Sequence, residues 1–473
     1  MAFEENVSRI VMGHDANDRY NGIFHSISYT VTEQLRSVNL NNNTIFTPSY
    51  GSNIFDYAFS GCQFLESVTN LNLSNVSSMK YAFYGCQNLN NVVITSNPTK
   101  IDMGFAYQNC VRLTNASIEG ASNLNNTFNG CTSLTSVTGN IHSDCTNMDS
   151  AFKNCNSLIT APTIPSNVND MDSTFSGCTS LVNPPVINAY NISGNNAFNG
   201  CTSLTSLPDL SRFINLESTF RGCTSLTSID LNSISSSVTS LIGTFSNCTN
   251  LTSIINIPST ITNMTSTFAS CTSLTTAPTI PSNVTNMNST FLFCASLIVT
   301  PTIPSNVTNM YGTFQGCTSL TTVQNIPNLV TNMERTFTSC TSLTTAPIIP
   351  NSVTNMSHTF QGCIYLVNVP NISNSTTDMS YTFSSCWSLT TAPTIPNSVT
   401  NMNRTFEGCT SLTGNIVIES SNVTNITNIF DGTTANKYVY IPYNSTTYNT
   451  FIAAGYDENG TKEGVYLRDI STL

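Results

Sequence analysis

Apolar residues recur along the chain in one fixed order, with a period close to 23 residues. In one unit of this pattern Phe268 is followed by Cys271 and Leu274, and Phe291 opens the next unit. Apolar residues three or four apart would favour a helix if they were taken alone. However, residues 275–287 hold two prolines and many Thr, Ser and Asn, which break helices and favour short extended segments and turns. The pattern therefore predicts coils whose apolar residues share one interior.

The cysteines mark the repeat. Sixteen of the 17 form a series from Cys62 to Cys409 with spacings of 21 to 25 residues. Phe stands three residues before each of them, with Tyr107 as the single substitute, and Leu stands three residues after. One coil cannot bury its own apolar side chains, so the coils must stack into a solenoid. The predicted core ladder is represented by three consecutive coils: Phe268, Cys271, Leu274, Phe291, Cys294, Leu297, Phe314, Cys317 and Leu320.

The repeat phrase F-x-x-C-T-S-L-T-x-x-x-x-I-P-x-x-V-T-x-M resembles the BspA-type leucine-rich repeat of surface proteins, over about residues 55–433. Residues 71–89, LNLSNVSSMKYAFYGCQNL, are similar to the related repeat of mycoplasma and bacterial surface proteins. Residues 437–456 resemble the segment that caps the last coil of such proteins, with Tyr456 where Trp is more usual. The resemblance implies a leucine-rich-repeat solenoid with one short parallel β-strand per coil and a loop, turn or short helical return. It also implies adhesion or surface recognition and no enzyme activity.

The two ends of the chain do not follow the repeat. We predict an N-terminal cap or docking segment at residues 1–54, a leucine-rich-repeat solenoid at 55–433 and a C-terminal cap at 434–473. Residues 24–32 alternate apolar and polar side chains, as a strand does. An open solenoid end exposes unpaired backbone groups, so we expect both terminal segments to shield it.

Charge is scarce in this chain. Charged residues make up 8% of it, the net charge is −11, and no Asp, Glu, Lys, Arg or His occurs from Leu231 to Met333. With 14 Lys and Arg the chain lacks the basic patch that nucleic acid requires. The first residues carry acids where a signal peptide needs positive charge, and no apolar run is long enough to cross a membrane. We therefore expect no nucleic-acid partner, no signal peptide and no membrane insertion.

The cysteines do not predict a chemical site. There is no CxxC pair and the four histidines are scattered, which disfavours zinc. Stacked cysteines would direct their side chains in parallel into the core, so we interpret them as buried free thiols, with partial oxidation between neighbours as the alternative. Cys145 lies outside the series; we expect an ordinary loop role for it, and it is the one candidate for an exposed thiol as the alternative. A repeating array offers no unique catalytic trio, so we predict no catalytic residue, no metal and no cofactor.

The repeat does predict surface rows. Thr recurs after the Leu of successive coils, where a row of hydroxyls could bind a glycan. Alternatively, Thr occurs there because it is favoured in strands and keeps an uncharged surface hydrated. Ice is a further alternative, which the prolines disfavour. Four aromatic residues replace small polar ones and are candidate contact residues, with local packing variation as the alternative. The candidate binding surface comprises Tyr311, Tyr365, Tyr381, Trp387, Thr276, Thr279, Thr322, Thr345, Thr391 and Thr394.

These features together suggest a non-enzymatic protein of a virion or an extracellular surface. Low charge, abundant Ser, Thr and Asn, and an elongated repetitive body suit a phage tail, fibre or capsid decoration protein. Such a protein would contact a host surface glycan or protein through its repeats and other virion proteins through residues 1–54. A bacterial or protozoan cell-surface adhesin is the first alternative. A structural spacer without receptor binding is the second.

Overall fold

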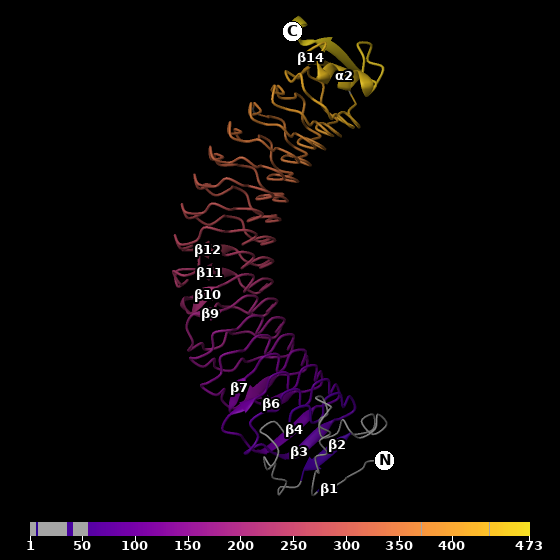
Figure 1. The fold of residues 1–473 in the computed structure, drawn as a ribbon. Helices are drawn as coiled ribbons and strands as arrows, with labels where there is room; N and C mark the ends of the chain where they lie inside the picture. Colours follow the sequence, from indigo (N-terminus) through magenta and orange to yellow (C-terminus); the bar gives the residue numbers. More distant parts are fainter. Residues whose placement is uncertain (1–5, 8–35, 41–54, 370, 435) are drawn as a thin grey trace. The chain divides into compact units, whose positions relative to one another are not determined.

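The computed structural model describes residues 6–7, 36–40, 55–369, 371–434 and 436–473. The chain divides into two compact units. Unit 1 contains Met1–Leu226 and Ser233–Val238, and unit 2 contains Thr227–Asn232 and Thr239–Leu473. In each unit successive coils lie side by side and pair in parallel, as the indigo-to-magenta and magenta-to-yellow parts of Figure 1 show. The predicted leucine-rich-repeat solenoid with one short parallel strand per coil is confirmed.

Unit 1 carries the longer strands. Its first sheet has the order β1-β2-β3-β4, and the pairs β5–β7, β6–β8 and β9–β10 follow, all parallel. A 3₁₀ turn, η1 (Leu210–Arg212), precedes the last strand. The strands are β1 (Asn6–Val7), β2 (Ser37–Leu40), β3 (Ser67–Asn72), β4 (Asn91–Ser96), β5 (Ile101–Asp102), β6 (Asn115–Ser117), β7 (Ala121–Asn123), β8 (Ser136–Thr138), β9 (Ile192–Ser193) and β10 (Phe213–Asn215).

Unit 2 has shorter strands through most of its length. Strand β11 (Ser228–Asp230) pairs with β12 (Ser253–Ile255), and the following coils are joined by single parallel bridges, such as Thr276 with Val299. Proline has no backbone N–H to donate to a neighbouring coil. The prolines in these coils therefore account for the short parallel pairing between them. The elements after β12 are β13 (Ile416–Val417), β14 (Lys437–Ile441), α2 (Thr446–Ala453), β15 (Val465–Asp469) and η2 (Ile470–Thr472).

The core is the predicted ladder of Phe, Cys and Leu. All nine side chains predicted for it are fully buried. The phenylalanine rings of adjacent coils stack on one another, as in Phe291 and Phe314, whose centroids are 5.7 Å apart with an interplanar angle of 2°. Adjacent coils are therefore joined by these stacked rings and also by backbone hydrogen bonds, such as the one from the N–H of Phe291 to the carbonyl oxygen of Thr313.

The cysteine at each rung has a specific role. The backbone carbonyl of Phe291 accepts a hydrogen bond from the backbone N–H of Cys294 in its own coil, and a second one from the thiol of Cys317 in the next coil. A buried carbonyl has two lone pairs, and the thiol occupies the second one without adding bulk. All 17 cysteines are free and buried. Burial raises the thiol pKa of Cys62 to about 11 and those of Cys363 and Cys409 to about 12.

Cys145 is neither the ordinary loop residue expected from the sequence nor the exposed thiol considered as the alternative, because its side chain is completely buried. Cys145 is followed by Thr-Asn-Met, so the segment matches the V-T-N-M segment that begins at Val284. Cys145 therefore fills the core position that Val fills in other coils. Its thiol lies 3.6 Å from the backbone oxygen of Asn147, and burial raises its pKa to about 11.

Each coil turns tightly at two left-handed residues, one directly before the cysteine and one five residues before it. In one coil these are Gly316, with φ of 73°, and Gly312, with φ of 57°. Several other coils place bulky residues at the second of these positions, including Tyr81 and Phe105, with φ of 56° and 61°. Side chains larger than glycine are strained there, so a ring at this position indicates a compensating contact.

The C-terminal segment covers the last coil of unit 2. Strand β14 continues the parallel pairing, with Ile416 opposite Val439, and β15 pairs with β14 on its other side. The ring of Tyr456 meets that of Phe430 edge-on, with centroids 6.0 Å apart, and so ends the stack of phenylalanine rings. The predicted N-terminal segment, residues 1–54, lies largely outside the described residues, as does the strand-like stretch 24–32.

Candidate functional site

The threonines predicted to bind are exposed in the structure. The side chains of Thr276 and Thr279 make no hydrogen bond within the described part of the chain, and the same holds for Thr322, Thr345, Thr391 and Thr394. Threonines at another position of the coil do form hydrogen bonds with the preceding coil. For example, the hydroxyl of Thr285 donates to the backbone oxygen of Thr262. The predicted threonines thus keep their hydroxyls available to a ligand.

These threonines do not form an uninterrupted row. Backbone bridges join Thr276 to Val299 and Val299 to Thr322, so an apolar side chain stands between the two hydroxyls. Asn368 follows Thr345 in the same way. The face therefore alternates hydroxyl, apolar and amide groups, and it lacks the strict repetition that a regular lattice such as ice would need.

Two of the predicted aromatic residues lie in adjacent coils of unit 2, in the turn that follows the cysteine. Tyr365 is 57% exposed and Trp387 is 54% exposed. The backbone N–H of Ser388 donates to the backbone oxygen of Ile364 at 3.0 Å, which joins the residues next to the two aromatics. Val367 in the first of these coils is also exposed. We call Tyr365, Val367 and Trp387 the aromatic patch.

The other two predicted aromatics lie in the turn before the cysteine. Tyr381 is only half-exposed: its ring stacks on that of His358 at 4.4 Å, and the guanidinium of Arg404 lies 5.6 Å from its centroid. Tyr311 is exposed and belongs to a coil separated from that of Tyr381 by two further coils. The structure therefore distributes the predicted residues over three parts of the coil and does not gather them into one site.

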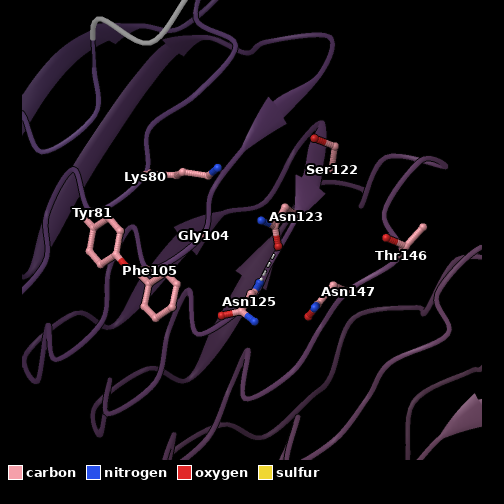
Figure 2. A pocket seen from close by; sticks show the side chains of 9 residues that line it. All are labelled: Lys80, Tyr81, Gly104, Phe105, Ser122, Asn123, Asn125, Thr146 and Asn147. Atoms are coloured by element: carbon pink, nitrogen blue, oxygen red, sulfur yellow. Dashed lines mark hydrogen bonds between the residues drawn. The ribbon is translucent and has the colours of Figure 1, made fainter.

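Unit 1 contains an open depression that the sequence did not predict. Its volume is about 570 Å³. Figure 2 shows two aromatic rings at one end and amide side chains from consecutive coils beside them. The lining residues are Lys80, Tyr81, Gly104, Phe105, Ser122, Asn123, Asn125, Thr146 and Asn147.

The aromatic end of the depression is a stack of three rings. Tyr57 stacks on Tyr81 with centroids 4.7 Å apart, and Tyr81 stacks on Phe105 at 4.6 Å with an interplanar angle of 6°. All three occupy the left-handed position five residues before a cysteine. The next coil has Asn126 at that position, and among the described residues no further ring stacks on Phe105. One face of the Phe105 ring is thereby left without an aromatic neighbour.

The polar wall is held by one carboxylate. Asp102 forms an ion pair with Lys80, with Nζ and Oδ2 2.9 Å apart, and its Oδ1 accepts from the side-chain amide of Asn123 at 3.1 Å. The oxygen of Asn123 in turn accepts from the backbone N–H of Asn125 at 3.0 Å, the bond drawn in Figure 2. The lysine charge is thus neutralised and the amide row is fixed in orientation.

Several polar groups of the depression have no hydrogen-bond partner within the described part of the chain, and two of them belong to Asn147 and Thr146. The side-chain oxygen of Asn147 accepts from the backbone N–H of Asp149 at 2.8 Å, which directs the amide NH₂ away from the backbone. That NH₂ group makes no hydrogen bond there, and neither does the hydroxyl of Thr146. Both are available to a molecule that enters the depression.

A signal for this site does exist in the sequence. Three consecutive repeats carry an aromatic residue five positions before the cysteine, namely Tyr57, Tyr81 and Phe105, where most later repeats carry Ser, Asn or Gly. The coil from Cys110 to Cys131 is also the shortest, at 21 residues. Aligning the repeats position by position, and not only on their conserved residues, would have shown both.

The described residues contain no group of three or more His, Cys, Asp or Glu side chains placed to hold a metal ion. Among them, no helix is both long and apolar enough to cross a membrane.

Solved structures of leucine-rich-repeat proteins are similar to this chain at low sequence identity. The chain is similar to a leucine-rich repeat protein from Bacteroides ovatus, with 20% identity, 92% of each chain covered and a TM-score of 0.47. It is also similar to a leucine-rich cell surface protein from Faecalibacterium prausnitzii, with 25% identity, 61% of this chain and 79% of that one covered, and a TM-score of 0.39. Both TM-scores lie below 0.5, so neither likeness bears on the ligand. A search of curated proteins found no match.

The model of the BspA-type leucine-rich repeat region matches the chain in six overlapping copies, which together run from residue 32 to residue 454. The copies match residues 32–159, 105–217, 194–321, 242–358, 303–413 and 335–454. The repeats that carry the aromatic patch and the depression both fall within these matches. The chain therefore belongs to the family of proteins with BspA-type leucine-rich repeats.

Proposed function

We propose that the chain is a non-enzymatic recognition protein that binds a host surface glycan or protein through its exposed repeat faces. The observation that carries this proposal is the aromatic patch, in which Tyr365 and Trp387 are each more than half exposed in adjacent coils. Exposed Trp and Tyr on a rigid frame are favoured contact residues, because they bury a large area for little loss of side-chain freedom. The unpartnered hydroxyls of Thr276 and Thr279 add hydrogen-bonding groups to the same unit.

The chemistry of the surface supports a polymeric partner. Charged residues make up only 8% of the chain, so contacts made by the repeats are apolar contacts and hydrogen bonds. Such contacts are individually weak, and an array of similar coils gains affinity by engaging several at once. Binding should consequently depend little on salt, since screening acts on charges.

Binding of fluorescently labelled protein to intact cells of the source culture tests this proposal. We expect saturable staining by the unaltered chain and a loss of at least about tenfold in affinity for the double variant Tyr365→Ala/Trp387→Ala. Ile452→Ala, which removes an exposed apolar side chain from α2 outside the repeats, serves as the control and should bind normally. Equal staining by the patch variant and the unaltered chain would contradict the proposed role of the patch.

For the location of the protein we propose display on a phage particle, with residues 1–54 contacting other virion proteins. Low charge and abundant Ser, Thr and Asn in a repetitive body support this proposal. Immunogold labelling of purified particles and of intact cells from the source culture is the test. Gold on particles supports virion display, whereas gold on cells with bare particles would replace it with a cell-surface adhesin. The spacer alternative predicts that coils can be deleted without loss of host attachment.

A further inference from the structure

We propose that the depression in unit 1 at Tyr81, Phe105 and Asn147 is a binding site for a neutral carbohydrate. This inference takes its biological setting from the proposed recognition function, but its residues and its ligand chemistry are independent of the aromatic patch. A pyranose presents a face of C–H bonds and an edge of hydroxyl groups, and the depression offers a counterpart to each.

The counterpart to the C–H face is the ring of Phe105. One side of this ring is occupied by Tyr81 at 4.6 Å, and Asn126 follows at the position where a further ring would continue the stack. The face of an aromatic ring carries partial negative charge and attracts the weakly positive hydrogens of C–H groups. Two stacked rings behind it hold Phe105 in place, so little side-chain freedom remains to be lost on binding.

The counterparts to the hydroxyl edge are the free amide of Asn147 and the hydroxyl of Thr146. Asn147 is oriented by the backbone N–H of Asp149, which leaves the NH₂ group as a donor for a sugar oxygen. Thr146 can donate or accept. Figure 2 shows both residues along the depression from Phe105, on the far side of Asn125. An apolar platform with a few convergent polar groups is the usual composition of a small-molecule site, and the volume of about 570 Å³ lies within the usual range.

The charges around the depression favour a neutral ligand over an acidic one. Lys80 is paired with Asp102 at 2.9 Å, and Lys100 nearby in sequence is paired with Asp144 at 2.7 Å. An anionic sugar would have to break one of these ion pairs before its own charge could pair with a lysine. A neutral sugar needs no such exchange, because it can use the donors that are already free.

The test is saturation-transfer NMR on the full chain with methyl glycosides of glucose, galactose, mannose and N-acetylglucosamine. We expect transfer to the ring hydrogens of at least one of them, with a Kd in the millimolar range that an open site and a small ligand imply. Phe105→Ala should weaken binding about tenfold or more, whereas Phe105→Tyr should retain it, since Tyr81 shows that tyrosine fits this position.

A second variant tests the hydrogen-bonding group without disturbing the coil. Asn147→Asp keeps the oxygen that accepts from the backbone of Asp149 but replaces the NH₂ donor, and Asp170 shows that aspartate serves in the equivalent turn. Its sugar affinity should fall about tenfold, with the circular dichroism spectrum unchanged. Sugar binding that is unaffected by Phe105→Ala and Asn147→Asp, or no transfer to any of the four glycosides, would overturn the proposal.

The two proposals can fail separately. If no glycoside binds while the unaltered chain still stains cells through Tyr365 and Trp387, the carbohydrate site is wrong and the recognition function stands. If a glycoside binds through Phe105 while no cell is stained, the carbohydrate site stands and recognition through the aromatic patch is wrong.

Discussion

The thiol of Cys317 donates a hydrogen bond to the backbone carbonyl of Phe291 in the preceding coil, at a distance of 3.2 Å. The same bond recurs along the ladder, for example from Cys340 to Phe314 at 3.1 Å. The repeat therefore uses cysteine as a small apolar residue with a donor, which joins each coil to the one before it.

Replacing this donor should weaken the contact between two coils. We expect Cys317→Ala to lower the free energy of unfolding by about 1–3 kcal/mol, because a buried carbonyl loses one of its two hydrogen bonds and a small void remains. Equilibrium denaturation monitored by circular dichroism measures the change. Thr308→Ala, at an exposed position in the same unit, is the control and should change stability little. A Cys317→Ala variant as stable as the control would show that the thiol bond contributes nothing.

The buried thiols should make the protein sensitive to alkali. Burial raises the pKa of Cys62 to about 11 and of Cys363 to about 12, above the value of about 8.5 for a free thiol. The folded chain thus keeps protons that the unfolded chain releases, so this stability is complete below about pH 8.5 and is lost as the pH rises toward the raised values. The denaturation midpoint should therefore fall between about pH 7 and pH 9.5. A constant midpoint over this range would contradict the burial of the ladder.

Loss of one ring should remain local. Phe314 stacks between Phe291 at 5.7 Å and Phe337 at 5.8 Å, and Phe314→Ala should cost about 3–5 kcal/mol in its own coil. Because coils contact only their neighbours, hydrogen exchange should accelerate in these coils and remain slow in distant ones. Uniform acceleration throughout unit 2 would instead indicate that the unit unfolds as a single cooperative block.

Removal of the C-terminal segment should cause association. Deleting residues 437–473 exposes the edge of β13 and uncovers the ring of Phe430, which Tyr456 now meets edge-on. An unpaired edge with adjacent apolar surface is a template for pairing between chains. Light scattering after size-exclusion chromatography should reveal oligomers or aggregate. A truncated chain that stays monomeric and soluble would show that the segment is not a cap.

The core was predictable because the same constraint recurs in every coil. Phe314, Cys317 and Leu320 could be placed from spacing alone, since any residue three positions either side of the cysteine must face the shared interior. Cys145 was misplaced because it was compared with the other cysteines, although the Thr-Asn-Met that follows it aligns it with the valine position.

The candidate site depends on residues that differ from one coil to the next. These differences are lost when the repeats are reduced to one consensus sequence. Phe105 ends the stack of aromatic rings because Asn126 follows it one coil later, in the shortest coil of the series. Likewise Tyr381 is half-covered by His358, a contact that exists only because both residues take the left-handed conformation. Stacking at this turn position depends on the left-handed backbone conformation, and the apolar pattern of the core does not encode it.

The central claim is that this protein binds a surface polymer and leaves it chemically unchanged. Surface plasmon resonance of the full chain on immobilised envelope polysaccharide from the source culture, followed by mass spectrometry of the recovered polysaccharide, tests it most directly. The account predicts saturable, reversible binding, a reduced response for Tyr365→Ala/Trp387→Ala, and a polysaccharide of unaltered mass. The absence of saturable binding, or a polysaccharide that is cleaved on exposure to the chain, would contradict it.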